Sequence, residues 1–586
     1  MKITIWPAVA FVCFSSVISG AQSGPRTGSD DRYCRPGNVP AFGEKDGPAI
    51  LPQSCFYTAL SATPSPGKEI AVSSGEDLQK AIAQARCGDT LLLHSGTSYV
   101  GAFEFPAKGC DDTHWITVRT DGDLPKEGTR TSPCYAGVAS LKGRPPFACS
   151  NPKKEMATVV VPPRRSIKVA DHYRFMGLEI TRAASGGIVY DLVNAQNGTK
   201  IIFDRAWMHG TAEDETTRAV AFPGATYIAA IDSYFSDLHC VARTGSCTDS
   251  QTLWAGTGPV AGGTYKIVNN YLESAGEGVL FGGGGGSATP TDIEIRRNYF
   301  YKPPSWNRRD PNFIGITYIV KNNLEFKNAA RALVEGNVLE NSWGGFTQMG
   351  FQLLLTPKNQ NSRCPECVVH DITVRYCVLR HSGSGVQLAN TPDGALHGVS
   401  RGMSHVSIHD LIIDDIDANR YAGNGFTFQI SNDDSPLQDL TIDHVTVPHS
   451  ERMLFVVGGP TGGNPMSNIT ISNSILDVGA YEAISTGARG AQNCAYRQRF
   501  PRDIFDSCWK PYRFTNNVLI RPHGAWPSGN FSAGDVKRIG FAAVQNDSVL
   551  DFRLKGDSPY RRKGEGQTDL GADAAKIAEE IAGATE

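Results

Sequence analysis

Charged side chains that could carry out acid–base chemistry stand close together in the segment Asn323-Leu-Glu-Phe-Lys327. If this segment is a strand, alternation points Leu324 and Phe326 inward. Glu325 and Lys327 would then lie on the outer surface, where a carboxylate beside an ammonium group can serve general acid–base catalysis. A solvated strand carries such residues without any function, and both interpretations stay open.

A second carboxylate, Glu277, lies at a loop-to-strand turn one sequence repeat before Glu325. If Glu277 faces the same groove, two carboxylates and a nearby lysine would be available for catalysis. A position in a turn gives the side chain no defined direction, so a carboxylate bonded to local backbone amides is the alternative. The wider set of candidate catalytic residues is Glu277, Glu325, Lys327, Lys358 and Arg218.

Outward-facing polar and aromatic side chains are also expected on neighbouring short strands, such as Gly385-Val-Gln-Leu388. Amides can bond sugar hydroxyls, and an aromatic ring can stack on the face of a sugar. A sheet that faces water carries polar residues in any case, and this alternative stays open for each glutamine. The candidate substrate-binding residues are Trp254, Gln352, Gln387 and Gln429.

A metal site is a further hypothesis. The acidic run Glu213-Asp-Glu215 offers the hard carboxylate oxygens that Ca²⁺ prefers, and a solvated acidic loop is the alternative. Ca²⁺ is therefore the one candidate cofactor. His209, His239 and His381 each follow an expected strand, but none has a partner at a recognisable spacing.

The elements that would position these residues come from a repeated phrase: apolar, two variable residues, small polar, one variable residue, apolar. Copies include Ile267…Asn270…Leu272, Ile295…Asn298…Phe300 and Val334…Asn337…Leu339. Successive copies are about 25–45 residues apart, a period that indicates a solenoid of stacked units. Stacking would place the small polar residues above one another, and we expect their amides to bond between units.

On these repeats the chain resembles the right-handed parallel β-helix, or pectin-lyase-like, superfamily, which implies an all-β solenoid. Residues 77–85 form an expected amphipathic helix that would cap its first end, as in many secreted carbohydrate enzymes of this fold. The resemblance also implies that substrate lies along the third strands, and loops 301–320 and 389–404 are expected to form walls. As a whole the chain looks most like secreted bacterial β-helix proteins of undefined activity, and no family's catalytic motif transfers to it.

The chain has 586 residues and a net charge of −3, which favours neither a nucleic acid nor an anionic membrane as partner. Its beginning reads as a secretory signal, so an extracellular or periplasmic monomer is expected. The expected organisation is a signal peptide over 1–21, a loosely ordered arm over 22–66, the β-helix over 67–540 and a capping tail over 541–586.

Cysteine spacing predicts local disulfides. Removal of residues 1–21 would leave 13 of the 14 cysteines, an odd number for an oxidising compartment. Cys377 occupies a small-polar position of the repeat, and we expect it to be a buried free thiol. The remaining neighbours would pair as Cys34/Cys55, Cys87/Cys110, Cys134/Cys149, Cys240/Cys247, Cys364/Cys367 and Cys494/Cys508.

The functional expectation is a polysaccharide lyase that cleaves a uronate-containing, pectin-like polymer by β-elimination. This reaction needs a group that neutralises the uronate carboxylate and a base, roles open to Lys327, Lys358 or Arg218. One alternative is a glycoside hydrolase that uses Glu277 and Glu325 as a carboxylate pair. The other alternative is a non-catalytic glycan-binding or adhesion solenoid.

Overall fold

The computed structural model describes residues 32–73, 77–184, 186–346, 348–390, 398–433, 435–463, 466–545 and 548–586. The expected signal peptide, residues 1–21, lies outside the described residues. No helix within these ranges is long and apolar enough to cross a membrane.

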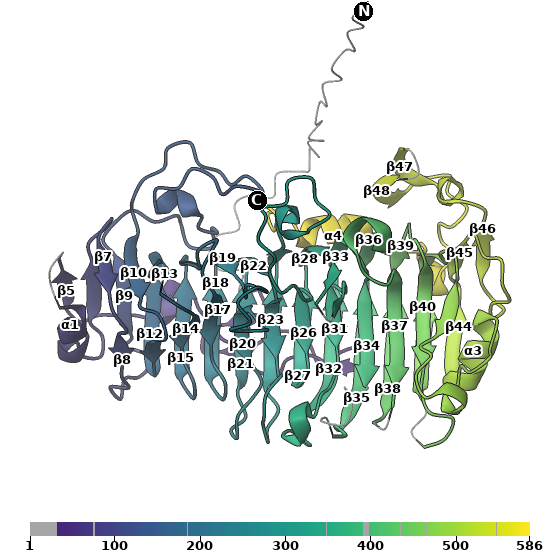
Figure 1. Ribbon diagram of the computed structural model, residues 1–586, viewed down its shortest axis with the longest axis horizontal. Coiled ribbons are helices and arrows are strands. Elements are labelled where there is room, and N and C mark those ends of the chain that lie inside the picture. The colour runs from purple at the N-terminus through teal and green to yellow at the C-terminus, as the bar shows by residue number, and fades with distance from the viewer. Residues whose placement is uncertain are drawn as a thin grey trace, which may run out of the picture.

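Three long parallel sheets of 14, 14 and 12 strands form a coil, and the chain visits them in turn once per repeat (Figure 1). The first sheet contains β5 Glu69–Val72, β6 Thr90–Leu93, β9 Ile116–Thr120, β12 Asp171–Met176, β15 Thr199–Asp204, β18 Thr226–Ile231, β21 Gly263–Val268, β24 Thr291–Arg296, β27 Ala329–Glu335, β32 Val368–Arg375, β35 Gly402–His409, β38 Leu437–Asp443, β41 Ser467–Ser472 and β44 Tyr512–Thr515.

The second sheet contains β7 Ser98–Val100, β10 Ala157–Val161, β13 Leu178–Arg182, β16 Trp207–His209, β19 Tyr234–Leu238, β22 Tyr271–Ser274, β25 Tyr299–Tyr301, β28 Val338–Ser342, β33 Val378–Ser382, β36 Ile412–Ile416, β39 Thr446–Val447, β42 Ile475–Asp477, β45 Val518–Ile520 and β46 Phe531–Ala533. The third sheet contains β8 Glu104–Phe105, β11 Ile167–Val169, β14 Val189–Asn194, β17 Thr216–Ala221, β20 Gln251–Ala255, β23 Glu277–Phe281, β26 Leu324–Phe326, β31 Leu353–Leu355, β34 Val386–Asn390, β37 Phe426–Asn432, β40 Met453–Gly458 and β43 Ala483–Ser485.

Short elements decorate the coil. They are the strands β1 Cys34–Arg35, β2 Val39–Pro40, β3 Lys45–Asp46, β4 Ala49–Ile50, β29 Gly344–Gly345, β30 Gln348–Met349, β47 Phe541–Gln545 and β48 Ser548–Leu554, and the helices α1 Leu78–Gln84, α2 Ala418–Tyr421, α3 Pro501–Cys508 and α4 Ala574–Glu580.

The small polar residue of the repeated phrase lies at the bend between the first and second sheets. The Nδ2 atom of Asn270 donates to Oδ1 of Asn298 at 3.0 Å, and Asn298 donates to Asn337 in the same way at 3.0 Å. The next position is Cys377, whose Sγ accepts from the backbone N–H of Asn337 at 3.4 Å. The predicted ladder is confirmed here, whereas the looser copy at Leu411 places an apolar core residue at the same position.

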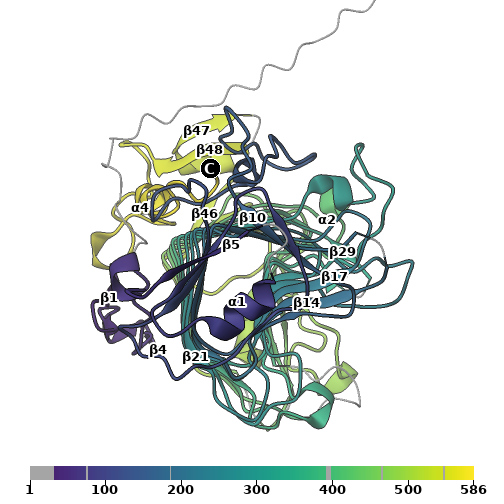
Figure 2. The same cartoon turned by 90° about the vertical axis from the view of Figure 1, so that its left-hand side faces the viewer.

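The helix α1 covers the open first end of the coil (Figure 2). Its N-cap residue Asp77 accepts a hydrogen bond from the backbone N–H of Lys80 at 3.2 Å, which satisfies a free helical donor. Leu78 and Ile82 are buried in the main core. The predicted capping helix is therefore confirmed, because an amphipathic turn buries the apolar edge that stacked strands would otherwise expose.

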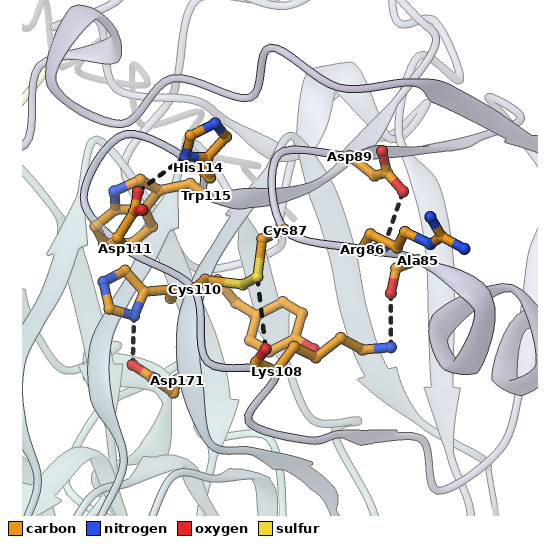
Figure 3. Close-up of a disulfide and its surroundings, with 12 residues drawn as sticks. Ala85, Arg86, Cys87, Asp89, Lys108, Cys110, Asp111, His114, Trp115 and Asp171 are labelled. Carbon is orange, nitrogen blue, oxygen red and sulfur yellow. Dashed lines mark hydrogen bonds and ion pairs between the residues drawn. A yellow bond between two sulfur atoms is a disulfide. The ribbon is translucent and has the colours of Figure 1, made fainter.

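A disulfide between Cys87 and Cys110 holds the connection that follows α1 (Figure 3). Beside it, Nζ of Lys108 donates to the carbonyl of Ala85 at the helix end, at 2.7 Å. All six predicted pairs are disulfides, with Cα–Cα separations from 5.1 Å to 5.7 Å. Among the described cysteines, buried Cys377 alone is unpaired, as predicted.

The described part of the N-terminal arm, residues 32–66, is not loosely ordered. It lies against the outer face of the first sheet, where Asp46 forms an ion pair with Arg375 at 2.5 Å. The backbone N–H of Ile50 donates to Asp371 at 2.9 Å. The expectation of a loose arm came from its Pro/Gly/Ser composition and lack of periodicity. Composition alone could not show that the arm binds charged side chains of the first sheet, such as Arg375 and Asp371.

At the other end of the coil, α3 inserts Ile504 and Phe505 into the main core. The tail 541–586 packs apolar side chains against the outer side of the second sheet near β42 and β45. It then turns back along the solenoid, so that α4 lies over the middle of the molecule (Figure 1).

Candidate functional site

One column of side chains faces outward along the third sheet. Strand register places its members on successive strands from β20 to β37, about 4.8 Å apart. Their apolar neighbours on β26, Leu324 and Phe326, are buried in the core, as alternation predicted. The members of the column are Trp254, Leu280, Glu325, Leu354, Gln387 and Gln429.

A cavity of about 270 Å³ opens over the middle of this column, and Glu325, Lys327 and Lys358 line it. The ammonium of Lys327 lies 3.5 Å from the Glu325 carboxylate. The Thr356 hydroxyl donates to the same carboxylate at 2.9 Å. Lys358 is brought beside Lys327 because its backbone N–H donates to the Lys327 carbonyl at 3.1 Å.

The charges in the cavity set the protonation of Lys327. Burial lowers the pKa of Lys327, but the carboxylates of Glu325 and Glu277 outweigh burial and leave that pKa above its usual value. Lys327 is therefore a cation at neutral pH. A fixed ammonium in a partly dehydrated cavity is suited to binding an anionic group.

Glu277 does not line this cavity, contrary to the expectation that it would share one groove with Glu325. It is 0 % exposed; Gln251 donates to its carboxylate at 2.8 Å, and the ammonium of Lys321 lies 3.6 Å away. Burial raises the pKa of Glu277, Lys321 opposes that change, and Asp249 reinforces it. The loop after β25 lies against the start of β23, since the backbone N–H of Lys321 donates to the Ala275 carbonyl at 2.9 Å and the buried Lys302 ammonium donates to the Gly276 carbonyl at 2.6 Å.

Arg218 and Trp254 form a separate part of the outer face. The guanidinium carbon of Arg218 lies 4.2 Å from the centre of the Trp254 ring, and its Nε donates to Gln251 at 2.8 Å. Strand β17 is three strands from β26, a separation of roughly 14 Å. The structure therefore does not bring Arg218 to the cavity.

Gln352 is not an outward substrate-binding residue. It is fully buried, where it accepts a hydrogen bond from the Asn323 amide and donates to the Arg380 carbonyl at 2.8 Å. The reason is that β31 begins at Leu353, one residue later than Gln352. The outward position of this coil consequently belongs to Leu354, which lines the cavity.

Gln387 and Gln429 keep the outward positions expected of them. The amide of Gln387 donates to the side-chain oxygen of Gln429 at 3.0 Å, and Gln429 donates to Ser431 at 3.2 Å. Gln387 lines the cavity, and Gln429 lines a second cavity of about 270 Å³ further along the sheet. Their role in binding stays a prediction.

The cavity has walls that the sequence did not identify. The hairpin β29–β30, in the connection between the second and third sheets, supplies Gln348 and Met349. The long loops 301–320 and 389–404 do not share one side: the first precedes a third-sheet strand and the second follows one. Residues 391–397 of the second loop lie outside the described residues.

Within the acidic run Glu213–Glu215, one carboxylate is engaged by hydrogen bonds within the protein. The Glu215 carboxylate accepts from the backbone N–H of Val241 at 3.2 Å and from the Thr244 hydroxyl, and it is buried. The described residues include no group of three or more His, Cys, Asp or Glu side chains placed to hold a metal ion.

The three histidines have separate local environments. His209 contacts Glu179 at 3.0 Å, and His381 contacts Asp415 at 2.7 Å. His239 is fully buried and stacks on Tyr318 at a centroid distance of 3.9 Å. None of the three lines the cavity over the outward column.

Lys321 and Asp249 are the charged residues that sequence reasoning missed. They form an ion pair with each other, and the Lys321 ammonium also lies 3.6 Å from the Glu277 carboxylate. Both lie in irregular connections, where no periodicity reports direction. The triple leucine 353–355 was the available signal for Leu354, since a strand buried on one side and covered on the other reads as continuously apolar.

These three parallel sheets, wound around one core with an internal asparagine ladder, define a parallel β-helix. No protein-family model and no curated protein sequence matches the chain.

Solved structures with a similar course of the chain include three lyases. A mannuronic acid specific polysaccharide family 6 lyase from human gut microbiota has 9% identity and a TM-score of 0.42, over 80% of this chain and 93% of that chain. A family 6 alginate lyase has 13% identity and a TM-score of 0.41, over 88% and 58%. The pectate lyase Pel9A has 11% identity and a TM-score of 0.34, over 87% and 97%.

Proposed function

We propose that the chain is a polysaccharide lyase that cleaves a uronate-containing polymer by β-elimination on the outer face of the third sheet. The observation that carries the proposal is the cavity in which Lys327, Lys358 and Glu325 meet. The outward column continues on both sides of this cavity, so a polymer chain has room to extend along the coil.

The proposed chemistry begins with the carboxylate of the bound uronate. The Lys327 ammonium binds that carboxylate and thereby acidifies the adjacent C–H bond. Lys358 is the base of this proposal and accepts the proton from that carbon. The electron pair of the broken C–H bond forms a new carbon–carbon double bond, and the glycosidic oxygen on the neighbouring carbon departs and takes up a proton from solvent, to which Lys358 later returns the proton that it accepted.

Glu325 acts in this scheme as a positioning residue. Its carboxylate, fixed by Thr356, holds the Lys327 ammonium at 3.5 Å and sustains its positive charge. A glycoside hydrolase needs two carboxylates that flank the scissile bond. Glu277 is buried, so only one of the two expected carboxylates lines the cavity. Elimination is therefore the reaction that this arrangement supports best.

The six disulfides support the proposal that the protein works outside the cytoplasm. Disulfides of this number persist in oxidising compartments, which are also where extended polysaccharides are encountered. Extracellular or periplasmic action is the corresponding part of the proposal.

The test is incubation with polygalacturonate, alginate and a glucuronate polymer, with absorbance followed at about 235 nm, where the conjugated product of proton abstraction absorbs. A rise in absorbance with one polymer is the expected result. New reducing ends without that absorbance would indicate a hydrolase instead. Binding without either signal would indicate a non-catalytic glycan-binding protein.

A further inference from the structure

A separate cavity of about 260 Å³ lies on the other side of the hairpin β29–β30. The hairpin is a shared wall, because Gln348 and Met349 line the cavity that holds Lys327 whereas Phe346 lines this one. The view down the coil places β29 on the same side of the molecule as β14 and β17 of the third sheet (Figure 2). A ligand that lies along the outward column would therefore pass close to both cavities.

Aromatic side chains supply the walls of this second cavity. Trp306, Tyr318 and Trp343 are almost fully buried, and the Trp306 and Tyr318 rings meet edge to face at 4.9 Å. Phe346 differs from them, since it is 59 % exposed at the hairpin. An exposed ring beside a rigid aromatic floor offers a sugar an apolar face on which to stack.

Two arginines also line the cavity, and neither forms an ion pair with a carboxylate among the described residues. Arg308 donates through Nε to the Thr317 hydroxyl at 3.0 Å, and Arg309 donates through one terminal nitrogen to the Ala418 carbonyl at 3.0 Å and to that of Asn419 at 2.5 Å. Asp310, the nearest acidic residue in sequence, accepts from the backbone N–H of Asn312 at 2.7 Å and does not line the cavity.

Arg308 and Arg309 are exposed residues, so a ligand can reach their guanidinium groups from solvent. They differ in this from half-buried Arg375, whose guanidinium is paired with Asp46 and Glu335. At Arg308 both terminal nitrogens have no bond to the described residues, and their planar fork matches the geometry of a carboxylate. Positive charge without a protein counter-ion, next to an aromatic surface, is complementary to an acidic sugar.

We infer that this cavity is an accessory subsite for a second acidic sugar residue of the same polymer, bound by Arg308 and Arg309 and stacked on Phe346. The identification of the ligand as a sugar of the cleaved polymer rests on the proposed function. The subsite selects polymers that carry carboxylates on more than one residue, and it raises affinity without taking part in bond cleavage.

The experiment uses the full chain with Arg308→Gln and Arg309→Gln combined. The matched control combines Arg35→Gln and Arg538→Gln, which removes one exposed arginine charge from the N-terminal arm and one from the segment directly before the C-terminal tail. Calorimetry measures the binding of galacturonate, mannuronate and glucuronate tetramers, in a Lys327→Ala background so that no probe is cleaved. Tetramers with carboxylates reduced to alcohols serve as neutral probes.

We expect the Arg308/Arg309 variant to bind its best acidic tetramer at least tenfold more weakly, and the control variant to stay within twofold. Affinity of the unsubstituted cavity should also fall with added salt, because the contacts are ionic. Phe346→Ala should weaken acidic and neutral tetramers alike. Equal affinity of the two double variants for every acidic tetramer, or no measurable binding of any tetramer, overturns the inference.

The outcome is separate from that of the proposed function. If a uronate polymer is cleaved and the Arg308/Arg309 variant keeps its KM, the subsite is refuted and the lyase stands. If no polymer is cleaved and acidic tetramers still depend on the two arginines, the lyase is refuted and the acidic-sugar subsite stands.

Discussion

The outer faces of the first and third sheets are built from the same coils, yet they are treated in opposite ways. On the first sheet the N-terminal arm covers charged side chains and pairs them, as Asp46 does with Arg375 at 2.5 Å. On the third sheet Glu325, Lys327 and Lys358 surround a cavity that no segment of the described chain fills. The arm covers the charges of the first sheet and pairs them, whereas the charges of this cavity line an open face, where we propose that a ligand binds.

The largest expected effect concerns the open face. Lys327→Ala should lower cleavage of the preferred polymer by about 10²–10⁴-fold, the range for loss of a group that acts in proton transfer or its electrostatic support. The matched control is Lys168→Ala, since Lys168 faces outward from β11 of the same sheet and is exposed. Equal cleavage rates for these two variants would mean that a lysine in the cavity is no more important for cleavage than a lysine elsewhere on the same face.

The covered face should respond in stability. Asp46→Asn removes the partner of Arg375 and His409, and we expect the free energy of unfolding to fall by about 3 kcal/mol. Urea unfolding measures this difference. Asp123→Asn, an exposed carboxylate on a connection, is the control and should change stability by less than about 0.5 kcal/mol. Unchanged stability in Asp46→Asn would show that the arm does not brace the sheet.

The ion pairs of Asp46 with Arg375 and His409 also predict how the stability of the protein depends on pH. Burial raises the pKa of Asp46, but its bonds and charges with His409 and Arg375 outweigh burial and lower the pKa to about 2. Burial lowers the pKa of His409, but its bonds to Asp410 and Asp46 outweigh burial and raise the pKa to about 9. The Asp46 contribution is therefore lost as pH falls from 3.8 through about 2, and the His409 contribution is lost as pH rises from 6.5 through about 9.

We expect the free energy of unfolding to decline by about 2 kcal/mol between pH 6.5 and pH 9 from this histidine. His409→Gln should remove that part of the decline, and urea unfolding at several pH values measures it. If the free energy of unfolding of the unsubstituted protein does not change over this interval, His409 does not stabilise the fold through its bonds to Asp46 and Asp410.

The smallest effects distinguish two glutamines that look alike in sequence. Gln352→Ala should cost about 1–3 kcal/mol of stability, because the Asn323 amide and the Arg380 carbonyl lose a buried partner. Gln387→Ala should leave stability within about 0.5 kcal/mol and should raise KM by a few fold. The reverse pattern would mean that the inward and outward faces of these coils have been exchanged.

The fold was predictable because the repeat of a solenoid recurs many times along the sequence. Asn298 and Asn337 predicted the ladder, and the cysteine spacing predicted the disulfides that the structure contains. The predicted inward or outward direction of a side chain was wrong where the residue lay at a bend. Gln352 was placed outward because alternation was extended to a residue that precedes β31 and lies at the bend, where alternation does not set the direction of a side chain.

The candidate site was only partly predictable for a related reason. Alternation placed Glu325 and Lys327 correctly on the outer face, since both flank inward-facing Phe326. It could not place Lys321, which reaches Glu277 from the end of a long loop. Contacts made between irregular connections leave no periodic trace, and these contacts decide which carboxylate faces the cavity.

The most direct test of the central claim is the mass of the products released from the preferred uronate polymer, compared between the unsubstituted protein and Lys327→Ala. We expect oligosaccharides that carry a double bond and are lighter by one water molecule than hydrolysis products. In Lys327→Ala these unsaturated products should nearly disappear. Saturated products of full hydrolytic mass, or unsaturated products formed equally fast by both proteins, would contradict the central claim.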